Sequence, residues 1–146
     1  MIRGRNLEPD VIKVVEHQEN LCFSSVGLVL NRRRPIFGAS PDAINNEYVL
    51  EVKCPTTEEN IKYYISQDGQ VMPKVLAQIQ LAMDMTERKK ALLCVASHDF
   101  EHSKKVQFVR LNYDEGYVNS MVENATQFWK TYVFPNLYNG SAKFFE

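Results

Sequence analysis

Three polar residues in the first half of the chain have the side chains that metal-assisted phosphate chemistry requires. Asp42 follows Pro41. Glu51 and Lys53 come nine and eleven residues after Asp42. Carboxylate oxygens are the ligands that Mg²⁺ and Mn²⁺ prefer in proteins. Such a cation activates water and neutralises charge on a phosphoryl group, and a nearby ammonium stabilises the same charge. The combination therefore suits hydrolysis of a phosphodiester bond.

These side chains can meet if the chain reverses between Asp42 and Glu51. The pair Asn45-Asn46 predicts a turn, and the alternating residues 48–54 predict a strand that Pro55 closes. Because side chains alternate along a strand, Glu51 and Lys53 project from the same face. The alternative is an ordinary Glu-x-Lys pair on a solvated strand, with Asp42 serving only the turn. The Pro-Asp before the pair and the Cys-Pro after it favour a site.

Hydrophobic periodicity predicts the elements that position this site. We expect helices at residues 6–16, 57–65, 73–86 and 114–133, and strands at 21–30, 36–40, 48–54, 91–97 and 106–111. Pro9 would fall in the first turn of the first helix, where proline is tolerated. The strand at 21–30 would be interrupted near Ser24, Ser25 or Gly27, and Arg32 to Arg34 would form an exposed turn. The order α-β-β-β-α-α-β-β-α indicates a mixed sheet flanked by helices, in the mixed α/β or α+β class.

The composition is that of one globular domain over residues 1–146. Hydrophobic residues make up 45% of the chain, charged residues 24%, and the net charge is −1. The total charge does not indicate a nucleic-acid partner, so DNA binding would require a local basic face. Basic residues do gather at four places, although a solvated loop is the favoured interpretation of any single group: Arg3 and Arg5, Arg32 to Arg34, Arg88 to Lys90, and Lys104-Lys105.

Other residues favour structural interpretations. The three cysteines lack metal-binding spacing and are expected to be buried, reduced thiols. His98 and His102 are expected in a polar loop rather than at a metal. The aromatic residues of the last helix, Phe128, Trp129, Tyr132 and Phe134, are expected in the core rather than as a base-stacking platform. No membrane-spanning run or secretory signal is present, so we expect an intracellular protein that has no membrane partner.

Four motifs in the same order resemble the YqaJ-type viral recombinase nucleases, a family of the PD-(D/E)xK superfamily whose best-known member is phage lambda exonuclease. They are Arg-Gly-Arg-Asn-Leu-Glu at 3–8, Gly-Ala-Ser-Pro-Asp at 38–42, Leu-Glu-Val-Lys-Cys-Pro at 50–55 and Ala-Gln-Ile-Gln-Leu-Ala-Met at 77–83. The second and third are specific when taken together. The resemblance covers nearly the whole chain and implies a restriction-endonuclease-like core.

The resemblance implies roles for individual residues. Asp42 and Glu51 would bind Mg²⁺ or Mn²⁺ together with the backbone carbonyl of Val52, and Lys53 would be the catalytic lysine. Glu8 matches an acidic residue that approaches the metal, often through water. Read without the family pattern, Glu8 could simply complement the helix dipole.

Gln78 matches a helix glutamine that positions water or phosphate, although an isolated glutamine here could simply be solvated. Ser40, Arg3 and Arg5 could contact a substrate phosphate. For Ser40, a hydrogen bond within the local turn is an equal alternative. Ala43 stands where family members commonly have glycine.

The activity that the resemblance implies is 5′-to-3′ digestion of duplex DNA ends for recombination, in the cytoplasm or nucleus of a host cell. A single-strand annealing protein and a ring-shaped homo-oligomer would be its partners besides DNA. Family members usually carry a sizeable region before the first-helix glutamate, which we expect this chain to lack. A structure- or sequence-specific endonuclease on the same core, and a DNA-binding or assembly module that has lost cleavage, remain alternatives.

Overall fold

The computed structural model describes the backbone of residues 2–142, with side chains at positions 3–4 and 6–138. The chain forms two compact units, Met1–Tyr113 and Asp114–Glu146. The first unit contains the helices α1 (Ile2–Glu19), η1 (a 3₁₀ helix, Glu58–Tyr63), α2 (Pro73–Thr86) and α3 (Phe100–Ser103), and the strands β1 (Val29–Leu30), β2 (Gly38–Ala39), β3 (Ala43–Ile44), β4 (Tyr48–Lys53), β5 (Lys90–Ala96) and β6 (Val106–Asn112).

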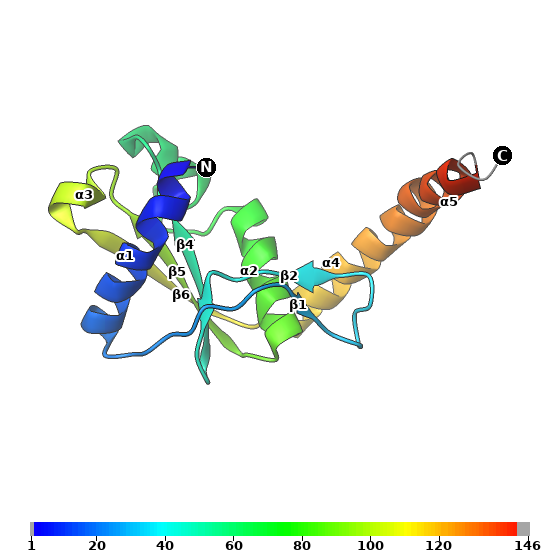
Figure 1. Cartoon of the computed structure of the whole chain (residues 1–146), viewed down its shortest axis with the longest axis horizontal. Coiled ribbons are helices and arrows are strands. Elements are labelled where there is room, and N and C mark those ends of the chain that lie inside the picture. The colour runs from blue at the N-terminus through cyan, green and yellow to red at the C-terminus, as the bar shows by residue number, and fades with distance from the viewer. Residues whose placement is uncertain (1, 143–146) are drawn as a thin grey trace. The chain divides into compact units, whose positions relative to one another are not determined.

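The centre of the first unit is a mixed four-stranded sheet in the order β3-β4-β5-β6. Strands β4 and β5 are parallel, whereas β3 and β6 run antiparallel to their neighbours. Strands β1 and β2 form a separate two-stranded sheet beside α2, as Figure 1 shows. The predicted mixed sheet flanked by helices is therefore confirmed.

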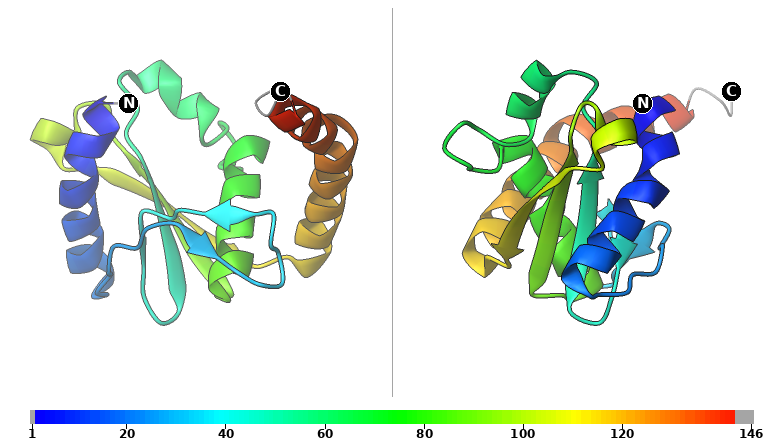
Figure 2. Two further views of the ribbon diagram at one scale, coloured as in Figure 1. Left: turned by 45° about the vertical axis from the view of Figure 1, so that its right-hand side comes forward. Right: turned by 90° about the vertical axis from the view of Figure 1, so that its left-hand side faces the viewer.

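Helices α1 and α2 cover opposite faces of this sheet, which Figure 2 shows from two sides. The alternation of side chains divides the core between them. On the α1 face, Val11 and Val15 pack against the side of the sheet that carries Leu50, Val52, Leu92, Cys94 and Ala96. On the α2 face, Val75, Ile79, Ala82 and Met83 pack against Val49, Ala91, Leu93 and Val95. Strand β5 is buried on both faces, as its continuous apolar run predicts.

Helix α2 begins and ends at the predicted residues. Pro73 occupies its first turn, where the missing N–H has no intrahelical partner in any case. The helix stops at Glu87, whose φ of 59° is left-handed. Val75, Ile79, Ala82 and Met83 recur at helical spacing and are buried.

Two expectations for the first 30 residues are wrong. Helix α1 begins at Ile2, so Pro9 lies in its interior rather than in its first turn. Residues 21–30 contribute only β1 and one isolated bridge between Ser24 and Ile44. The segment favours a strand locally, but most of it has no neighbouring strand with which to form a ladder.

The second unit consists of consecutive helical segments: α4 (Glu115–Phe128), a π-helical turn η2 (Trp129–Val133) and α5 (Phe134–Ala142). Asp114 caps α4 by accepting a hydrogen bond from the Tyr117 N–H at 2.9 Å. The side chains of Phe128, Tyr132 and Phe134 are 59%, 62% and 48% exposed, so the core position expected for them is wrong. None of the described helices has the length and apolar character needed to cross a membrane.

The cysteines differ in burial, although all three are free thiols. Cys94 is buried in β5 and Cys54 is half-buried after β4, but Cys22 is exposed. The expectation of a buried thiol is therefore wrong for Cys22, which lies in the irregular segment after α1.

Candidate active site

The hairpin between β3 and β4 brings Asp42 beside β4. Its turn is closed by the Asn45 side chain, whose Oδ1 accepts hydrogen bonds from the N–H groups of Glu47 at 2.9 Å and Tyr48 at 2.7 Å. The Asp42 Oδ2 atom accepts a hydrogen bond from the Val52 N–H at 2.7 Å. The predicted turn is confirmed, and it fixes one carboxylate against the edge of the strand that carries the other.

The same edge of β4 exposes a backbone carbonyl next to Asp42. Strands β3 and β4 pair only at Ala43 with Leu50 and Ile44 with Val49. If this pairing continued by two residues, Pro41 would lie opposite Val52, but proline has no N–H to donate. The N–H and C=O of one strand residue lie on the same edge in an antiparallel ladder. The Val52 carbonyl therefore lies on the edge where its N–H already meets Asp42.

Glu51 is a buried carboxylate whose two oxygens differ in their hydrogen bonds. The residue is only 2% exposed. Its Oε1 atom accepts hydrogen bonds from Lys53 Nζ at 2.6 Å and from Gln78 Nε2 at 2.7 Å. The Lys53 ammonium also donates to Gln78 Oε1 at 3.3 Å, which closes a three-membered network. Glu51 Oε2 is buried and has no hydrogen-bond partner among the described residues.

Burial shifts both carboxyl groups of this arrangement towards their neutral forms. Burial, and then the charge of Asp42, raise the pKa of Glu51 to about 7, although Lys53 and Gln78 lower it. Burial also raises the pKa of Asp42, against the opposing effects of the Val52 N–H and the Lys53 charge. Burial and mutual repulsion disfavour the negative charges of Glu51 and Asp42. A bound cation between them would stabilise both charges.

These groups suit a hard divalent cation. An unpartnered buried carboxylate oxygen, a second carboxylate and a strand carbonyl are oxygen ligands of the kind that Mg²⁺ and Mn²⁺ bind. Among the described residues no group of three or more acidic, histidine or cysteine side chains is placed to hold a metal. A cation here would therefore bind two carboxylates and need backbone and water oxygens for the rest of its shell.

A cavity of about 210 Å³ opens onto Glu51 and Gln78. Ser40 and Pro41 line it from the segment before Asp42, and Gly38 and Ala39 line it from β2. Ser40 is exposed at this opening, so its hydroxyl is accessible to a ligand of the cavity.

Helix α1 places Glu8 within electrostatic range of the same end of the sheet. Burial raises the pKa of the Cys54 thiol, the Arg3 guanidinium lowers it, and the carboxylates of Asp42 and Glu8 raise it further. The Cys54 thiol therefore lies within electrostatic range of both Asp42, in the hairpin, and Glu8, in α1. Glu8 has further interactions within the protein.

Arg3 holds the start of α1 against the ends of two strands. Its guanidinium donates to the carbonyls of Pro55 at 2.5 Å and His98 at 2.7 Å, and it forms an ion pair with Glu101 at 2.7 Å. A phosphate would have to compete with these contacts for the donors of Arg3. The side chain of Arg5, the other arginine expected at a phosphate, lies outside the described residues.

Two of the other basic groups are partly engaged within the protein. Arg34 donates to the buried Asp84 at 3.1 Å, and Arg33 pairs with Glu87 at 3.1 Å. Arg88 donates to the Asn45 carbonyl at 2.5 Å and so ties the end of α2 to the β3–β4 turn. These contacts give the groups a structural role that the sequence clusters alone did not indicate.

A model of the YqaJ-like viral recombinase domain matches residues 1–89. The chain is similar to the solved alkaline exonuclease LHK-Exo from Laribacter hongkongensis, with a TM-score of 0.78 and 23% identity over 99% of this chain and 75% of that one. The same exonuclease in complex with dAMP gives a TM-score of 0.78 and 24% identity over 99% and 74%. A phage-related exonuclease from Haemophilus somnus 129PT gives a TM-score of 0.61 and 13% identity over 82% and 64%. A comparison with curated proteins found no match. At these identities the structural likeness shows the fold.

Proposed function

Because this chain belongs to the family of YqaJ-like viral recombinase domains, we propose that it is a divalent-metal-dependent deoxyribonuclease that hydrolyses phosphodiester bonds. The observation that carries the proposal is the buried Glu51 carboxylate, which has an unpartnered oxygen and lies in a network with Lys53 and Gln78. A buried, raised-pKa carboxyl beside a second carboxylate is costly unless it serves a bound cation.

The cation ligands would come from the two strands of the β3–β4 hairpin, which holds Asp42 beside β4. Asp42 and Glu51 would hold Mg²⁺ or Mn²⁺ together with the Val52 carbonyl, and Glu8 would approach through water. When bound, the cation would lower the pKa of a water and neutralise charge on the phosphate. The Asp42 hydrogen bond to Val52 orients its carboxylate before any ligand arrives.

Lys53 and Gln78 would act on the phosphate and the attacking water. The ammonium of Lys53 forms an ion pair with Glu51 Oε1 at 2.6 Å. Its positive charge suits stabilisation of the negative charge that develops on the phosphate. Gln78 presents both a donor and an acceptor to this network and would orient water or phosphate. Ser40 would contact the phosphate from the mouth of the cavity.

The finer part of the proposal is that the enzyme is a 5′-to-3′ exonuclease on duplex DNA ends that prepares single strands for recombination. The family description and the exonuclease names of the similar structures support this choice over an endonuclease. A homo-oligomeric ring, a single-strand annealing partner, action within the host cell and a single nuclease domain over residues 1–146 remain predictions from the family resemblance.

Digestion of matched linear and covalently closed circular duplexes tests the proposal. Both substrates should carry the same sequence and be incubated with Mg²⁺, with Mn²⁺ and with chelator. We expect digestion of the linear duplex only, dependent on the cation, and earlier release of label from 5′ ends than from 3′ ends. Nicking of circles would establish the endonuclease alternative. Absence of cleavage with retained DNA binding would establish the binding module.

A further inference from the structure

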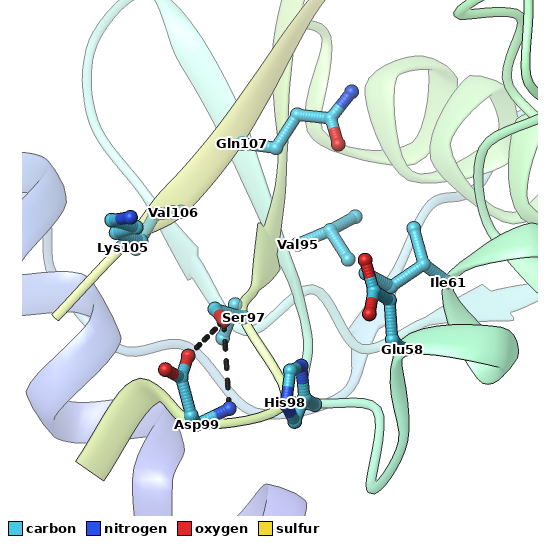
Figure 3. A pocket seen from close by; sticks show the side chains of 10 residues that line it. Glu58, Ile61, Val95, Ser97, His98, Asp99, Lys105, Val106 and Gln107 are labelled. Atoms are coloured by element: carbon cyan, nitrogen blue, oxygen red, sulfur yellow. Dashed lines mark hydrogen bonds between the residues drawn. The ribbon is translucent and has the colours of Figure 1, made fainter. Parts of the chain in front are cut away.

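A second cavity, of about 360 Å³, lies between η1 and the ends of β5 and β6. Its volume is at the lower end of the range for small-molecule sites. Figure 3 shows Ile61 and the Glu58 carboxylate of η1 facing Val95 of β5, while Gln107 extends from β6 above Val95. The cavity therefore has apolar side chains on one side and a carboxylate and an amide at its edge. Its remaining polar lining comes from Ser97, His98, Asp99 and Lys105.

The sheet register places this cavity beside the proposed active site. Lys53 pairs directly with Val95 across the parallel β4–β5 ladder, and Val95 pairs with Gln107 across β5–β6. Directly paired residues project from the same face of a sheet. At about 4.8 Å for each step between strands, Gln107 begins about 10 Å from Lys53 on that face. A group attached to a phosphate at Lys53 could thus extend into the cavity.

The charged groups of the cavity are mixed and do not form a cationic phosphate site. Lys105 lines it together with His98, but so do the Glu58 and Asp99 carboxylates, which would repel an anion, and no arginine does. Asp99 is already engaged by the hydroxyls of Ser97 and Ser103. In the part of the chain that the structure describes, the Glu58 carboxylate and the Gln107 amide have no hydrogen-bond partner, so both are available to a ligand.

These features suit a flat heterocycle with polar edges. A ring can lie in the cavity against Ile61 while its edge meets the amide and the carboxylate. Glutamine makes paired hydrogen bonds to the amino group and ring nitrogen of adenine, and a carboxylate accepts from the amino group of cytosine. Thymine has no exocyclic amino group and could donate to the Glu58 carboxylate only through its ring N3–H.

We propose that this cavity binds the base of a nucleotide adjacent to the scissile phosphate and favours bases that carry an exocyclic amino group. The inference rests on the proposed nuclease function of Lys53 and its neighbours. It assigns a base-recognition role to Glu58 and Gln107, which the sequence patterns did not single out.

Cleavage kinetics give the first test. Linear duplexes that differ only within two nucleotides of the cleaved bond should be compared for kcat/KM, using adenine, cytosine, thymine and purine, which is adenine without its amino group. We expect adenine and cytosine to be cleaved at least about fivefold faster than thymine or purine at one of these positions, the low end of what a paired contact contributes. Gln107→Ala should reduce the preference for adenine, and Glu58→Gln the preference for cytosine, to less than about twofold.

Gln18→Ala is the matched control, because Gln18 is an exposed glutamine of α1 on the other side of the sheet. The control should keep the wild-type preference. Equal rates for all four bases, or a preference that neither cavity variant changes, would overturn the inference while leaving the nuclease function intact.

Binding of deoxynucleosides separates the two proposals, because these probes lack the phosphate and need no cation. Deoxyadenosine, added to the chelator-treated protein, should shift the backbone amide signals of Val95 and Gln107 more strongly than thymidine does. This response without any DNA cleavage would refute the proposed function and retain the base site. Equal or absent responses to the two nucleosides would refute the base site.

Discussion

Replacing Glu51 by glutamine should change how the stability of the cation-free protein depends on pH. The substitution keeps the size of the side chain and removes its titration. Glu51 is 2% exposed, and its pKa is raised from 4.5 to about 7. The folded protein therefore binds more protons at this position than the unfolded chain does between pH 4.5 and 7. Stability from this group is present below pH 4.5 and is lost as the pH rises to 7.

The size of the effect follows from the two pKa values. At about 1.4 kcal/mol for each pH unit, the rise from 4.5 to about 7 corresponds to roughly 3 kcal/mol. At pH 4 the wild-type side chain is neutral, as glutamine is, so both proteins carry an uncharged group at position 51. Between pH 4 and pH 8 the stability of Glu51→Gln relative to the wild type should increase by this amount. Titrating groups that do not interact with Glu51 are shared by both proteins and cancel, whereas Asp42 interacts with Glu51 and contributes to the difference.

Urea unfolding followed by circular dichroism, in chelator and at several pH values from 4 to 8, measures this difference. Adding Mg²⁺ at pH 8 should stabilise the wild type more than the variant, because the cation offsets the buried charge. A stability difference that stays constant within about 0.5 kcal/mol across the range would refute the reasoning. It would mean that Glu51 is hydrated and titrates as an ordinary surface carboxyl.

Three further outcomes follow from the contacts around the site and the core. Asp42→Ala should abolish cleavage of end-labelled duplex while DNA binding in a filter assay persists; cleavage at the wild-type rate would disprove its role as a ligand. Lys53→Met should slow single-turnover cleavage by roughly 10²–10³-fold, with cation affinity preserved in calorimetry; lost affinity would make Lys53 structural. Tyr113→Phe removes the hydroxyl that donates to buried Asp84 at 2.7 Å, and should lower the free energy of unfolding by about 1–3 kcal/mol in urea titrations; an unchanged midpoint would show that water replaces it.

The proximity of Asp42, Glu51 and Lys53 could be predicted because it depends on local geometry. A turn and the twofold alternation of a strand are both readable from neighbouring residues. Gln78 is different, since it reaches Glu51 from a helix 27 positions away. Its contact followed only from the family resemblance.

The structural features that the sequence did not predict share one cause. Local sequence patterns do not show which distant segment packs or pairs with a helix or strand. Residues 21–30 have strand-forming side chains, but only Ser24 and β1 find strand partners. Phe128 and Tyr132 recur at helical spacing, yet both remain more than half exposed. Arg3 meets Glu101 from a distance of 98 positions, so its ion pair could not be deduced from sequence spacing.

The short pairing between β3 and β4 constrains insertions and deletions in this part of the chain. Asp42 lies beside Val52 only because Ala43 stays opposite Leu50. The longer β4–β5 ladder keeps Glu51 and Lys53 on the α2 face, so moving the β3–β4 pairing by one residue would shift Asp42 along the edge of β4 and away from Val52. Length changes in the Asn45 turn should therefore be far less acceptable than substitutions there, even though that turn lies at the opposite end of the strand from Lys53.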